Sequence, residues 1–147
     1  GIRAMDSLRY EKSYRMVGTE LSIEYSAYES GLDRFVYPDK GDFVGRNALL
    51  AWRDKGFSNT FVTVEVHGTT DADALGNNPI YGGDDLVGRA TGGNYGFRIC
   101  KSLALGMVRP ELAAVGTELR MNILGTDHEV TIIPESPYDP KNEKLRA

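Results

Sequence analysis

Short runs in which apolar and polar residues alternate fill the chain between residues 60 and 133. A period of two places successive side chains on opposite faces of a β-strand, so each run predicts a strand. The runs are closely spaced and turn residues separate them, which favours a small antiparallel barrel. The predicted strands cover residues 60–67, 79–81, 86–90, 102–108, 117–124 and 128–133.

Two of these strands alternate most clearly, and we expect their apolar side chains to be buried. The side chains concerned are Val62, Val64, Val66, Leu103, Leu105 and Met107. Residues 68–78 are polar and rich in turn formers, which is typical of a long exposed loop. The glycine cluster at residues 92–96 favours a bulge or a corner of the barrel over a phosphate cradle, because no helical pattern follows it.

The start of the chain carries a helical pattern, and Gly18 is a suitable glycine for the end of the helix. Ile2, Met5 and Leu8 share one helical face, and Arg9 falls between Ile2 and Met5 on that face. A guanidinium on a buried face needs acceptors, since leaving it unpaired is costly. Two roles remain open for Arg9. It could form a structural ion pair, which the pattern alone favours, or bind an anionic ligand whose carboxylate suits its planar fork.

The segment between this helix and the first predicted strand mixes several expected elements. A short helix is expected over residues 22–30, a strand over residues 32–37 and a helix over residues 46–55 that Gly56 ends. The last residues, 134–147, contain three prolines and many charges and should wrap the surface. The chain opens directly on a helical pattern, which we interpret as a sign that it is a fragment of a longer protein.

The amino-acid composition of the chain argues against several classes of function. The chain has 147 residues, 41% of them hydrophobic, and a net charge of -4, which is typical of an ordinary globular domain. The acidic balance argues against nucleic-acid binding, and no apolar run is long enough for a membrane span. His67 and His128 lack zinc spacing and are expected at strand ends on the surface, so no metal site is predicted. Cys100 is the only cysteine, which indicates a reducing, cytoplasmic location.

An ordered set of short stretches along nearly the whole chain resembles the C-terminal part of the glycine-cleavage T-protein superfamily of folate-dependent aminomethyltransferases. Within that superfamily, residues 9–15 and the ending at residues 137–146 look most like the folate module of sarcosine and dimethylglycine dehydrogenases. The matching stretches are residues 4–11, 18–21, 29–32, 40–49, 88–91 and 103–108.

The resemblance implies an α+β fold in two parts. Residues 1–56 would be the end of a folate-binding domain, with helices and a strand, and residues 57–147 a small antiparallel β-barrel with an extended tail. The cofactor would be tetrahydrofolate, which would receive a one-carbon unit from a methylated amine or a glycine-derived aminomethyl group. In the fused dehydrogenases a flavin domain precedes this module, so FAD is possible on an upstream domain.

The same resemblance places the family's catalytic aspartate in the upstream half of the protein. No catalytic residue is therefore assigned in this chain, and the isolated chain should be inactive. Arg9 matches the arginine of a family motif at the folate site and is the one cofactor-binding residue expected. The partners would be the upstream part of the same protein, folate and the amine substrate. The alternative function is a non-catalytic structural or partner-binding module of a flavin-dependent amine dehydrogenase.

Overall fold

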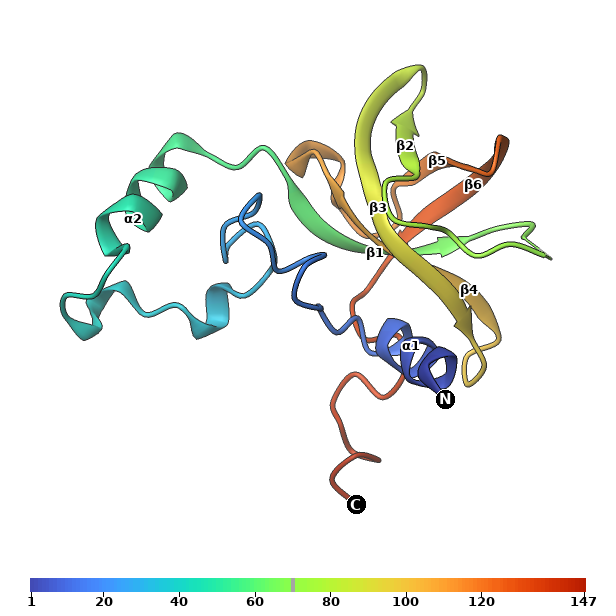
Figure 1. Cartoon of the computed structure of the whole chain (residues 1–147), viewed down its shortest axis with the longest axis horizontal. Coiled ribbons are helices and arrows are strands. Elements are labelled where there is room, and N and C mark those ends of the chain that lie inside the picture. Colours follow the sequence, from blue (N-terminus) through green and yellow to red (C-terminus); the bar gives the residue numbers. More distant parts are fainter. Residues whose placement is uncertain (70) are drawn as a thin grey trace.

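The computed structural model describes residues 1–69 and 71–147, and its second half is a closed antiparallel barrel (Figure 1). Within those residues six strands close in the order β1-β4-β3-β2-β5-β6, with β6 pairing back onto β1. The predicted α+β class with a small antiparallel barrel is therefore confirmed. The strands are β1 (Thr60–Val66), β2 (Pro79–Gly82), β3 (Asp85–Gly96), β4 (Lys101–Val108), β5 (Glu118–Ile123) and β6 (Thr126–Ile133).

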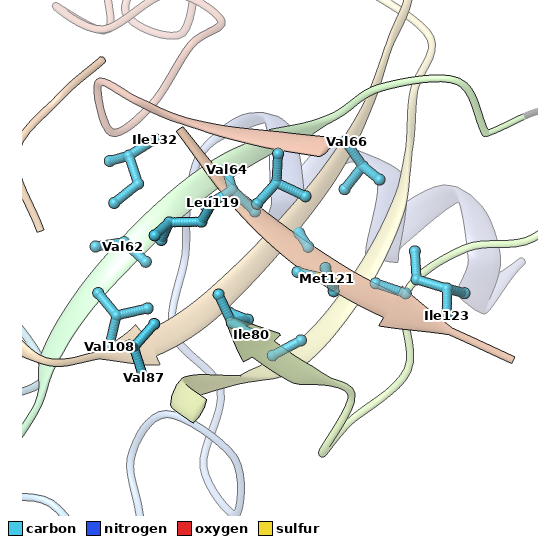
Figure 2. Close-up of a cluster of buried hydrophobic side chains, with 14 residues drawn as sticks. Val62, Val64, Val66, Ile80, Val87, Val108, Leu119, Met121, Ile123 and Ile132 are labelled. Carbon is cyan, nitrogen blue, oxygen red and sulfur yellow. The ribbon is translucent and has the colours of Figure 1, made fainter. Parts of the chain in front are cut away.

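The barrel interior is filled mostly by branched apolar side chains, together with a methionine and three alanines (Figure 2). Val64 of β1 is fully buried there, and its register neighbours are Ala104 of β4 and Ile132 of β6. Because side chains alternate along a strand, the next residues of β4 point outward. Leu103 and Leu105 nevertheless have no exposed surface, since they pack in a second apolar cluster with Tyr10 on the outside of the barrel. All six side chains expected to be buried are buried, on two different faces of the sheet.

The helix α1 (Ile2–Glu11) covers this outer face of β3 and β4. The hydroxyl of Ser7 donates to the Tyr95 carbonyl of β3 at 2.7 Å, and Tyr10 packs beside Leu105. The β3–β4 register shifts between Ala90 and Gly92, as expected for a bulge in the glycine cluster. A Cβ at position 92 would collide with the Tyr10 hydroxyl. The glycine in the bulge thus allows the helix to approach the sheet.

Two expectations about this helix are wrong. It ends at Glu11 and not at Gly18, because Ser13 adopts a left-handed conformation and its hydroxyl bonds to the hydroxyl of Thr63 inside the protein at 2.7 Å. The buried face of the helix consists of Ser7, Tyr10 and Glu11. The apolar face, with Ile2, Met5 and Leu8, is 51 to 73% exposed. The barrel surface offers carbonyls and backbone amides at this point, and polar side chains satisfy these groups.

The segment between α1 and β1 has less regular structure than the sequence suggests. Residues 22–30 form turns and not a helix, because the buried carboxylate of Glu29 accepts the Ser26 amide at 2.9 Å and the Asn59 amide at 3.2 Å. The strand expected over residues 32–37 is also wrong. The 3-10 turn η1 (Asp33–Phe35) lies there, followed by η2 (Pro38–Lys40). The barrel that the described residues form is closed, so it leaves no edge to pair with such a strand.

The helix α2 (Arg46–Lys55) forms as predicted and ends at Gly56. It has no buried residue, and it projects away from the barrel (Figure 1).

After β4 the 3-10 turn η3 (Pro110–Leu112) leads toward β5. The loop predicted at residues 68–78 lacks regular structure up to β2, and its residue 70 lies outside the described residues. No helix in the described part of the chain has the length and apolarity to cross a bilayer.

The residues after β6, 134–147, are called the C-terminal tail below. The tail turns back along the end of α1, where the Tyr138 amide donates to the Glu11 carbonyl at 3.1 Å. Arg15 forms two hydrogen bonds to the carboxylate of Glu135, at 2.7 and 2.9 Å. The chain ends therefore lie on the same side of the barrel (Figure 1).

Candidate functional site

A groove of about 490 Å³ lies between α1 and the C-terminal tail. Apolar side chains dominate the accessible surface of its lining, and charged groups stand around them. We call this cavity the helix–tail groove. It is lined by Met5, Leu8, Arg9, Glu11, Lys12, Tyr14, Arg98, Tyr138, Asp139, Lys144 and Leu145.

Arg9, the one residue expected to bind the cofactor, lines this groove. Only 13% of its side chain is exposed. Its Nη1 donates to the Tyr14 carbonyl at 2.9 Å and to Oε2 of Glu20 at 3.2 Å, and its guanidinium lies 4.3 Å from the Tyr10 ring centre. Its Nε is buried without a hydrogen-bond partner among the described residues. The ion pair considered from the sequence is therefore formed, at the wall of a groove that a ligand could enter.

Glu20 anchors this arginine from inside the protein. Its carboxylate is fully buried and accepts the Met16 amide at 2.9 Å, the Thr19 hydroxyl at 2.6 Å and the hydroxyl of Thr91 on β3. Burial alone would raise the pKa of Glu20, but the hydrogen bonds from Thr19, Thr91 and Met16, with the charge of Arg9, outweigh it and lower the pKa. Glu20 thus remains ionised and ties α1 to the barrel.

Glu11 closes the floor of the groove on the barrel side. The residue is 1% exposed, and its carboxylate accepts the Arg98 amide at 2.5 Å and the Ile99 amide at 3.4 Å. These amides belong to the turn between β3 and β4, so Glu11 holds that turn under the helix. The pKa of neighbouring Tyr10 is raised, chiefly because the phenol is buried.

The tail forms the opposite wall, and its central side chain is Tyr138. Arg98 Nη1 donates to the Tyr138 hydroxyl at 2.9 Å, and the Lys144 ammonium lies 5.1 Å from the ring centre. An aromatic ring with cations on its rim suits a planar, partly apolar ligand that carries negative charge. The groove can therefore bind and orient such a ligand.

Sequence reasoning found one wall of this groove and missed the other. Arg9 was identified, whereas Tyr138 and Lys144 were not, although they fall within the matched ending at residues 137–146. Glu20 was likewise missed, although it falls within the matched stretch 18–21. A single buried carboxylate whose partners include residues as distant in sequence as Thr91 leaves no periodic signal in the sequence.

The two histidines lie on the barrel, away from the groove. His67 follows β1 and is exposed, and its Nε2 lies 2.8 Å from the Thr131 hydroxyl. His128 Nδ1 lies 3.3 Å from the His67 carbonyl, so the fold brings these two residues together. Within residues 1–69 and 71–147, no three His, Cys, Asp or Glu side chains are placed to hold one metal ion.

Comparison with known proteins gives the fold a family context. Residues 59–139 match the sequence model of the glycine cleavage T-protein C-terminal barrel domain. The chain is 36% identical over 136 residues to the mitochondrial dimethylglycine dehydrogenase of Homo sapiens. It is 34% identical over 138 residues to the aminomethyltransferase of Thermosynechococcus vestitus. Among solved structures, aminomethyltransferase T of the glycine cleavage system from Bartonella henselae superposes with a TM-score of 0.86 at 22% identity, which shows a shared fold.

The chain corresponds to only part of each of these proteins. The alignments cover 92% of this chain and 16% of the human dehydrogenase, and 94% of this chain and 37% of the Thermosynechococcus aminomethyltransferase. The Bartonella structure is covered over 39% of its length and this chain over 95%. The match therefore extends beyond the barrel to most of the chain, including the segment that carries α2.

Proposed function

Because this chain belongs to the glycine cleavage T-protein family, we propose that it is the C-terminal part of a tetrahydrofolate-dependent aminomethyltransferase-like enzyme and that the helix–tail groove holds part of the folate. The observation that carries this proposal is Arg9, which the family resemblance connects with folate and which lines the groove. Folate joins a planar pterin and an aromatic ring to a glutamate carboxylate. The apolar lining, the Tyr138 ring and the nearby cations fit this combination.

The reaction we propose passes a one-carbon unit to N5 of tetrahydrofolate. A glycine-derived aminomethyl group would supply it with release of ammonia and of the group that carries it, whereas a methylated amine would supply it only after FAD on an upstream domain has taken two electrons from the N-methyl group. The residues of this chain would bind and orient the folate, which lowers the entropic part of the barrier. The catalytic carboxylate near the pterin would come from the upstream part of the protein, as in the family. FAD on a domain further upstream, and a reducing, cytoplasmic location inferred from the single Cys100, complete the proposal.

We also propose a division of the chain at residue 56. Residues 1–56 would complete a folate-binding domain, and residues 57–147 would form the barrel domain with its tail. Three apolar side chains before the boundary support this division, since Ile2, Ile23 and Val44 are 73 to 104% exposed. The absence of any buried residue in α2 supports it as well. Such surfaces suit burial by the upstream part of the protein.

One observation favours the alternative of a non-catalytic module in a flavin-dependent amine dehydrogenase. Arg9 already has a carboxylate partner in Glu20, at 3.2 Å. If that ion pair satisfies Arg9 completely, the arginine supports the packing of α1 and has no ligand to bind.

Arg9→Lys in the complete protein that carries this chain separates the two functions. Lysine keeps the charge but loses the planar fork, so tetrahydrofolate binding should weaken by about 1–3 kcal/mol with a smaller effect on folding. Isothermal titration calorimetry measures the affinity, and differential scanning calorimetry measures the melting temperature. Arg120→Lys is the matched control, because Arg120 pairs with Asp127 on the barrel outside the groove.

Two results would count against the proposal. Native folate affinity in Arg9→Lys, with a clear loss of stability, would assign Arg9 to the structural ion pair and favour the non-catalytic module. A complete wild-type protein that does not bind tetrahydrofolate at all would overturn the folate function itself.

A further inference from the structure

We propose that Lys12 is a positioning residue for the helix–tail groove: its ammonium group fixes the C-terminal tail as the second wall of the groove. The inference rests on the proposed function in one respect, namely that the groove holds folate. The placement of the tail by Lys12 is a separate property of the chain and can be measured without any ligand.

The contacts of Lys12 cross from the end of α1 to the tail. Its Nζ donates to the Tyr138 carbonyl at 3.1 Å, to the Asp139 carbonyl at 2.6 Å and to Oδ1 of Asn142 at 2.7 Å. An ammonium group has three protons, and these three oxygens account for all of them. Lys12 therefore acts on a ligand through the tail and has no donor left for direct contact.

The turn that Lys12 holds carries the outer part of the groove wall. The carboxylate of Asp139 accepts the Glu143 amide at 2.8 Å, the Lys144 amide at 3.3 Å and the Leu145 amide at 3.2 Å. Lys144 and Leu145 both line the groove. Fixing residues 139 and 142 thus fixes the backbone of the groove-lining residues that follow them.

The other anchors of the tail act closer to the barrel. The Ser136 amide donates to the Ser13 hydroxyl at 2.9 Å, and the Ser136 hydroxyl donates to the Lys12 carbonyl at 2.8 Å. Arg15 holds Glu135. These contacts use the backbone of Lys12 or neighbouring side chains, so they persist when the ammonium is removed. Loss of the ammonium should therefore free the tail only beyond Tyr138.

The test uses Lys12→Met, which keeps most of the side-chain length and removes the charge and all three donors. We expect trypsin to cleave faster after Lys141 and Lys144 in the variant, as followed by mass spectrometry of the intact protein. We expect the dissociation constant for tetrahydrofolate, measured on the complete protein, to rise about tenfold. The matched control is Lys101→Met. Lys101 is half exposed and pairs with Glu65 on the barrel, so both readouts should stay at wild-type values.

A truncation that removes residues 137–147 decides whether Lys12 works through the tail. If it does, Lys12→Met should add no further loss of folate affinity in the truncated protein, since the two changes remove the same interaction. An equal loss in the truncated and the complete protein would mean that Lys12 contacts the ligand, and would overturn the positioning role.

Unchanged tryptic cleavage in Lys12→Met would also overturn the inference, whatever happens to binding. A wild-type protein that does not bind tetrahydrofolate, with a tail that is released by Lys12→Met, would support the placement of the tail and reject the folate function alone.

Discussion

Three glutamates, Glu11, Glu20 and Glu29, lose nearly all contact with water in the folded chain, with exposed fractions of 0 to 2%. Removing a carboxylate from water is costly unless donors replace the water. Glu11 and Glu29 accept backbone amides, and the Ser26 hydroxyl adds a further donor to Glu29. Among the described contacts, only Glu20 has a cationic partner, Arg9. Hydrogen-bond donors therefore compensate for the burial of each of these carboxylates. Glu20 contributes both to the stability of the fold and to the position of Arg9 in the groove wall.

The lowered pKa of Glu20 predicts a specific pH dependence of stability. The pKa of Glu20 in the folded chain lies below 4.5, the ordinary value for a glutamate side chain. The ionised carboxylate of Glu20 therefore stabilises the fold at pH values above 4.5. This contribution is lost as the pH falls through the lower pKa of the folded state. Glu20→Gln should lower the free energy of unfolding at pH 7 by about 1–3 kcal/mol, because a buried guanidinium loses its charged partner. It should also make stability less dependent on pH in the acid range.

Urea unfolding of the chain at pH 7 and at a series of acid pH values measures both effects. Glu129→Gln, which changes an exposed glutamate of β6, is the control and should leave the curve nearly unaltered. If Glu20→Gln retains the full acid slope of the wild type, Glu20 is not the titrating group.

At the scale of elements, the contact between α1 and the bulge of β3 connects the groove to the barrel. Tyr10 is 5% exposed at this contact, and Gly92 leaves the space that its hydroxyl occupies. The φ angle of Gly92 is +154°, within the range that residues with a Cβ rarely adopt. The helix can approach β3 only because the sheet lacks a side chain there.

Gly92→Ala should therefore separate the helix from the sheet. We expect a loss of about 1–3 kcal/mol in the free energy of unfolding, since the added methyl collides with the Tyr10 hydroxyl. Denaturant unfolding measures the loss. Tyr10→Phe removes the colliding oxygen, so Gly92→Ala should cost less in a Tyr10→Phe background than in the wild type. An equal cost in both backgrounds would attribute the effect to the backbone of Gly92 alone.

At the scale of the whole molecule, the barrel and the segment that precedes it differ in how far their apolar side chains are buried. The barrel has a complete apolar interior, whereas the segment from α1 to α2 exposes large apolar side chains. Exposed apolar surface of this extent marks a site of interaction. Under the proposed function the upstream part of the protein covers it and supplies the catalytic carboxylate.

The isolated 147-residue chain should accordingly be catalytically silent. Incubation of the purified chain with tetrahydrofolate and a methylated amine or aminomethyl donor should yield methylenetetrahydrofolate at the uncatalysed rate only. The formation of the product is followed by chromatography, with the complete protein as the positive control. Robust turnover by the chain alone would show that the catalytic group lies within residues 1–147.

The barrel and the family could be predicted from the amino-acid sequence alone. A period of two marks a strand without reference to its partner, so the strand at residues 60–67 and the burial of Val64 could be predicted locally. Local patterns also predicted α2, and short sequence motifs indicated the T-protein family, whereas the role of Arg9 in binding the cofactor stays a prediction. Three features could not be predicted in this way: which face of α1 is buried, where α1 ends and how the tail closes the groove. These features depend on contacts between distant residues, such as Lys12 with Asp139, 127 positions apart. An amphipathic pattern identifies a face suited to burial, but only the fold determines which surface, if any, that face meets.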